Sequence, residues 1–84
     1  MKPLSQEQRQ KLIEFYRAVV PRGLLPGDSD MTLLMAAAYA GMYRKIHPAL
    51  FAANFRIPYE DMQEALEWIV AASIKRNTDP GGQN

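Results

Sequence analysis

The chain has 84 residues, of which 48% are hydrophobic and 23% are charged, and its formal net charge is +1. This length and balance predict one small globular domain, and the near-neutral charge gives no general attraction to nucleic acid or anionic lipid. Because there is no cysteine and only one histidine, disulfides, thiolate nucleophiles and metal sites built from several Cys or His ligands are excluded.

The N-terminal ten residues are polar and lack the apolar stretch of a signal peptide. An uncharged run of thirteen residues, from Met31 to Tyr43, is shorter than the about 20 residues that a membrane-spanning helix needs. We therefore expect a cytoplasmic protein of the small bacterial type that has no membrane partner.

The first predicted element is a helix over residues 5–20. Ser5 and Gln8 have the spacing of a capping box, in which each side chain satisfies a backbone N–H of the first turn. Apolar residues then recur at helical spacing, and Pro21 and Gly23 end the helix.

The uncharged run predicts a second helix over residues 29–46. Ser29 or Asp30 is suited to cap its start, and Arg44 and Lys45 suit the negative end of its dipole. A helix that is apolar on every side is a buried helix. We expect it at the centre of the fold, and three short partner helices do not cover it completely, which favours a second chain.

Two more helices are expected, over residues 48–55 and 58–76, each beginning at a proline. The whole is an all-α domain of four helices, orthogonal or bundle-like, over residues 1–76. The polar residues 77–84 are expected to form a disordered tail.

The stretch from Phe51 to Val70 has the pattern of a short helix, a tight turn and a longer helix. Small or apolar residues stand where such a hairpin is buried, namely Ala52, Phe55, Ile57, Met62, Ala65 and Leu66. This pattern resembles the helix-turn-helix of bacterial regulators, especially winged-helix repressors, over about twenty of the 84 residues. The resemblance implies a regulator whose second helix enters the major groove of DNA.

The hairpin differs from that family at its turn and on its second helix. Arg56 occupies a turn position that usually holds glycine, because the position often needs a positive φ. Carboxylates on the second helix would repel DNA phosphates. Nucleic-acid binding is therefore the alternative function. Its contacts would come from the basic first helix or from other basic residues, namely Arg44, Lys45, Arg56, Lys75 and Arg76.

The predicted fourth helix carries an acidic cluster of Glu60, Asp61, Glu64 and Glu67. The first 22 residues carry five basic side chains and two acidic ones. The cluster is therefore a candidate for binding a basic partner, or the basic first helix of a second copy. The simpler interpretation is a solvated helix face whose charges suit the helix dipole.

Trp68, Ala71 and Ile74 extend apolar surface around the side of the last helix that faces away from its main apolar stripe. Exposed tryptophan is a common anchor of protein interfaces. The alternative is that Trp68 covers the end of the first helix within one chain.

No set of side chains with catalytic spacing is present, and His47 is better suited to capping the third helix than to catalysis. We expect no enzyme activity, no cofactor and no metal. The leading hypothesis is an accessory or modulator protein that binds another protein through a helical surface, as a homodimer. The nucleic-acid-binding regulator is the alternative.

Overall fold

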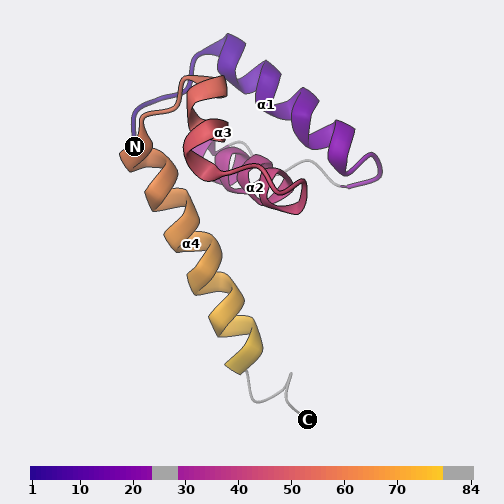
Figure 1. Ribbon diagram of the computed structural model, residues 1–84, viewed down its shortest axis with the longest axis vertical. Helices are drawn as coiled ribbons and strands as arrows, with labels where there is room; N and C mark the ends of the chain where they lie inside the picture. The colour runs from indigo at the N-terminus through magenta and orange to yellow at the C-terminus, as the bar shows by residue number, and fades with distance from the viewer. Residues whose placement is uncertain (24–28, 79–84) are drawn as a thin grey trace.

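The computed structural model describes the backbone of residues 1–23 and 29–78, and the side chains of these residues as far as Ile74. This part of the chain forms four helices and no strand: α1 (Gln6–Val19), α2 (Asp30–Tyr43), α3 (Pro48–Phe55) and α4 (Tyr59–Thr78) (Figure 1). The predicted all-α fold is confirmed. Helix α4 continues past its predicted end, and the rest of the predicted disordered tail, residues 79–84, lies outside the described residues.

The helices begin where capping side chains meet free backbone N–H groups. Ser5 and Gln8 form the predicted capping box, and the Ser29 hydroxyl accepts from the Met31 N–H. His47 caps α3, as its Nδ1 accepts from the Ala49 N–H at 3.1 Å. These caps satisfy N–H groups that have no partner within their own helices.

Two helices end at basic residues with left-handed backbone geometry. Lys45 has φ 62° and Arg56 has φ 57°. After Lys45, the Ile46 N–H donates to the Gly41 carbonyl, and after Arg56 the Ile57 N–H donates to the Ala52 carbonyl. This is the Schellman pattern, which stops a helix. The prediction that the second helix reaches residue 46 is therefore wrong, since the helix ends at Tyr43.

Helix α2 lies at the centre and packs against each of the other three helices. Its buried residues are Leu33, Leu34, Ala37, Ala38, Ala40 and Gly41. Helix α3 approaches closely at Gly41, where an added Cβ would lie 2.9 Å from the Phe51 ring. Phe51 in turn packs against Phe15 of α1, with ring centroids 5.7 Å apart. The central position predicted for this helix is confirmed.

One face of α2 is nevertheless left uncovered. Tyr39 is 59% exposed and Tyr43 is 77% exposed, and Met42 and Thr32 are also exposed. Helix α2 is therefore not buried on every side within one chain, as expected if three short partner helices do not cover it completely. Three helices surround the side that carries the buried leucines and alanines, and they leave the opposite side open.

Helix α4 is buried against the other helices only as far as Ile69. Met62, Ala65 and Ile69 are buried, whereas residues 70–74 are all exposed. With 20 residues, α4 is about 30 Å long, at 1.5 Å per residue. Figure 1 shows its second half extending beyond the other three helices. This extension leaves residues 70–74 of α4 exposed beside α2.

Candidate functional site

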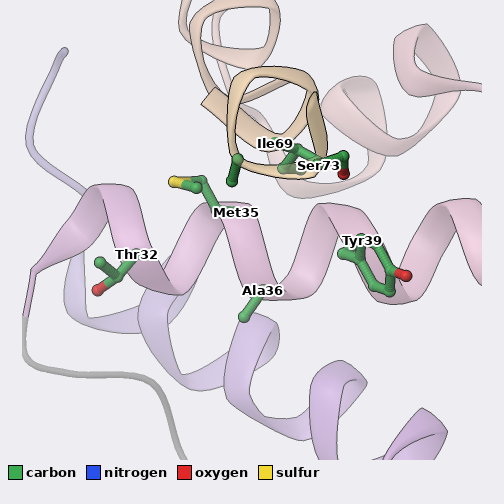
Figure 2. A pocket seen from close by; sticks show the side chains of 7 residues that line it. Thr32, Met35, Ala36, Tyr39, Ile69 and Ser73 are labelled. Carbon is green, nitrogen blue, oxygen red and sulfur yellow. The ribbon is translucent and has the colours of Figure 1, made fainter. Parts of the chain in front are cut away.

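A groove of about 460 Å³ lies in the corner between α2 and the second half of α4. The α2–α4 groove, as we name it, is lined by Thr32, Met35, Ala36, Tyr39, Ile69, Ala72 and Ser73. Figure 2 shows α4 crossing α2 near Met35, with Thr32, Ala36 and Tyr39 following one another along α2. Small side chains from both helices line this hollow, so a partner helix has room to approach closely.

The second feature is the α4 end, which we define as residues 68–74. This segment, WIVAASI, has no charged residue. Trp68 is 56%, Val70 54% and Ile74 57% exposed, and Ile69 is the buried member. Since consecutive residues are about 100° apart around a helix, Trp68, Val70 and Ile74 point in different directions from the α4 end. This exposed apolar segment makes the α4 end a candidate interaction surface.

The predicted partner-binding residues Trp68, Ala71 and Ile74 are all exposed within the α4 end. The alternative in which Trp68 covers α1 inside one chain is wrong, because more than half of its side chain is accessible. The groove was not predicted, and α4 lines it with Ile69, Ala72 and Ser73, which lie on a different face of the helix from the predicted apolar edge.

The acidic cluster divides between surface and interior. Glu60 and Glu67 are exposed and Glu64 is half-buried. Asp61 is 8% exposed and accepts the Lys2 N–H at 3.1 Å. The expectation that Asp61 belongs to an exposed acidic face is therefore wrong, since it holds the N-terminal segment against the start of α4.

Asp30 has a comparable role at the start of α2. It accepts the Leu4 N–H at 3.0 Å and forms an ion pair with Arg9. Carboxylates at the starts of α2 and α4 thus tie the N-terminal segment and α1 to the rest of the fold, in positions that suit the helix dipoles.

The predicted hairpin of α3 and α4 is present, and its turn has the left-handed residue, Arg56, that such hairpins need. Arg44 and Lys45 lie before α3, whereas Arg56 lies after it. The eight residues of α3 separate these basic groups by about 12 Å along its axis. Arg44, Lys45 and Arg56 are exposed, and the side chains of Lys75 and Arg76 lie outside the described side chains.

Comparisons of the chain with protein-family models, curated proteins and solved structures found no match. No helix in residues 1–23 and 29–78 has the length and apolar composition needed to cross a membrane. Among the side chains that the structure describes, no three His, Asp or Glu residues gather as metal ligands. The candidate site is therefore the α2–α4 groove together with the α4 end.

Sequence reasoning missed the contribution of α2 to this surface. Thr32, Ala36, Tyr39 and Tyr43 recur at intervals of four, three and four residues, which places them on one helix face. Three of these four side chains carry hydroxyl groups, unlike the leucines and alanines of the buried side. That difference within an uncharged run was the available signal for an exposed face.

Proposed function

We propose that this chain is a non-enzymatic protein that binds another protein through the α2–α4 groove and the α4 end. The observation that carries the proposal is an exposed apolar helix segment beside an apolar hollow. Interfaces have an apolar centre rich in aromatic side chains and a polar rim. Tyr39 in the groove and Trp68 in the α4 end are exposed aromatic side chains suited to such a centre.

The charges around this surface favour a protein over the other large partners. Glu60, Glu64 and Glu67 precede the α4 end on the same helix. Carboxylates at these positions repel the phosphates of nucleic acid and of anionic lipid. A partner with an apolar helix and a basic margin complements both parts of the surface.

The test is affinity capture of a bound protein by the tagged chain. The amount recovered is compared between variants in which one exposed apolar residue is replaced by serine. Trp68→Ser and Tyr39→Ser should each reduce recovery of a bound protein at least tenfold, as expected when an interface anchor is lost. Leu50→Ser is the matched control, because Leu50 is also exposed but lies on α3 and does not line the groove. Equal recovery with all three variants would contradict the proposal.

A titration with random duplex DNA at low salt tests the alternative function. We expect no binding that depends on the basic residues of the α3–α4 region. Tight binding that weakens steeply with salt, and that is lost in Arg44→Ala or Arg56→Ala, would replace the protein-binding proposal with nucleic-acid binding.

A further inference from the structure

Three basic residues gather where the N-terminal segment, the start of α1 and the turn between α3 and α4 meet. Two small hollows lie there, and Arg56 lines both of them. Lys2 lines the first hollow together with Arg56, and Lys11 lines the second. We name Lys2, Lys11 and Arg56 the basic cluster. None of the three lines the α2–α4 groove, so the basic cluster is separate from the proposed protein-binding surface.

The positive charges of the basic cluster are not neutralised by neighbouring side chains. Arg9 pairs with Asp30, whereas the three cluster residues are exposed and form no ion pair with a side chain that the structure describes. Glu7 lines the second hollow and is the only acidic residue in the described part of the chain that lines either one. Asp61 accepts the Lys2 backbone N–H but lines neither hollow. The local excess of positive charge favours an anionic ligand.

The backbone around the basic cluster also suits an anion. Helix α1 begins at Gln6, and Gln8 in its first turn lines both hollows. The positive end of the α1 dipole therefore lies beside them. The carbonyl oxygens of Phe55 and Arg56 would repel an anion, but both accept from the Gln8 amide. Gln8 thus covers the negative groups at the end of α3 and leaves the cations facing the hollows.

We propose that the basic cluster binds the two phosphate groups of a small soluble diphosphate. The guanidinium of arginine presents several N–H donors in a fork that matches phosphate oxygens, and lysine adds a mobile positive charge. Because Arg56 lines both hollows, it bridges the two phosphates, with Lys2 beside one and Lys11 beside the other. This site goes beyond the protein-binding function and does not depend on it.

The size of the hollows and the number of cations favour a small anion. The first hollow has a volume of about 70 Å³, several times the about 10–15 Å³ that one water molecule needs. It therefore has room for a phosphate group. The second hollow, of about 20 Å³, receives an oxygen of the other phosphate. Duplex DNA is held by many phosphate contacts along its length, so three cations suit a short anion better.

Calorimetric titration of the full chain with inorganic pyrophosphate at low salt tests the site. Arg56→Gly removes the bridging cation and suits the left-handed backbone at this position, so the chain stays folded. We expect it to raise the dissociation constant at least about tenfold, and Lys11→Ala to raise it about threefold or more. Arg17→Ala is the matched control, because Arg17 is an exposed cation of α1 that lines neither hollow. Its dissociation constant should stay that of the natural chain. No binding at millimolar pyrophosphate, or equal weakening in Arg56→Gly and Arg17→Ala, would overturn the proposal.

Nuclear magnetic resonance of the ¹⁵N-labelled chain locates the ligand. Pyrophosphate should shift the side-chain amide signals of Gln8 and the backbone amide signals of Lys11 and Arg56. The backbone signals of Tyr39 and Ala72, which line the α2–α4 groove, should stay in place. Shifts centred on the groove would overturn the assignment to the basic cluster.

Comparison ligands identify the kind of phosphate compound. Inorganic phosphate fills one hollow only, so we expect it to bind at least about tenfold more weakly than pyrophosphate. Random duplex DNA that displaces pyrophosphate at micromolar concentration would overturn the small anion in favour of nucleic acid. The protein-binding function fails separately, because Trp68→Ser should reduce protein capture and leave the affinity for pyrophosphate unchanged.

Discussion

At the scale of single residues, the Gln8 side chain links the start of α1 to the end of α3. The capping-box pattern in the sequence predicts only the first of these contacts. Its side-chain oxygen accepts the Ser5 N–H at 2.8 Å. Its amide nitrogen donates to the carbonyls of Phe55 and Arg56, at 3.1 and 2.9 Å. One side chain therefore caps the start of α1 and satisfies carbonyls at the end of α3.

Gln8→Glu should lower the free energy of unfolding by about 1–2 kcal/mol, because it removes the donor and places a charge beside two carbonyl oxygens. Gln6→Glu is the control, since Gln6 is exposed in the first turn of the same helix. At position 6 an added carboxylate interacts favourably with the dipole of α1, so the free energy of unfolding should not fall. Urea denaturation measures both, and an equal effect of the two variants would contradict the donor role of Gln8.

At the scale of elements, the turn between α3 and α4 places an arginine, Arg56, in a left-handed backbone conformation that glycine adopts more easily. Arg56 has φ 57° and ψ 40°, a left-handed conformation that glycine adopts with little strain. The hairpin forms because Ile57 is buried and its N–H satisfies a carbonyl of α3. Tertiary packing thus maintains a turn that the local residue does not favour.

Arg56→Gly should raise the free energy of unfolding by about 0.5–1 kcal/mol, since strain at this position is relieved. Arg44→Gly is the matched control, because Arg44 has φ −84° and gains nothing from glycine. Thermal unfolding of the two variants at one concentration measures the difference. Destabilisation by Arg56→Gly as large as that by Arg44→Gly would show that the Arg56 side chain contributes more than its backbone costs.

At the scale of the whole molecule, stability should depend on protein concentration if the homodimer expected from the sequence forms through the α2–α4 groove. Mass action then raises the Tm of the natural chain as concentration increases. Ala72→Glu places a charge in the groove and should remove this dependence, whereas Ala53→Glu on α3 should keep it. A Tm of the natural chain that stays constant over a hundredfold concentration range would contradict dimerisation.

The sequence by itself determined the helices, because caps, prolines and apolar spacing act over a few residues. Ser5, Ser29, His47 and Pro48 set three helix starts that were predicted to within one residue. The central position of α2 also followed from its uncharged composition. Local spacing further placed Trp68, Ala71 and Ile74 away from the main apolar stripe of α4.

Only the tertiary structure decided which apolar side chains remain exposed, because burial depends on how far neighbouring helices reach. Tyr39 and Tyr43 belong to the same uncharged run as Leu34, but only Leu34 is covered by neighbouring helices. Asp61 lies among glutamates in the sequence, yet it is buried in the fold and accepts the Lys2 N–H. The α2–α4 groove arises for the same reason, since α4 crosses α2 and extends past it.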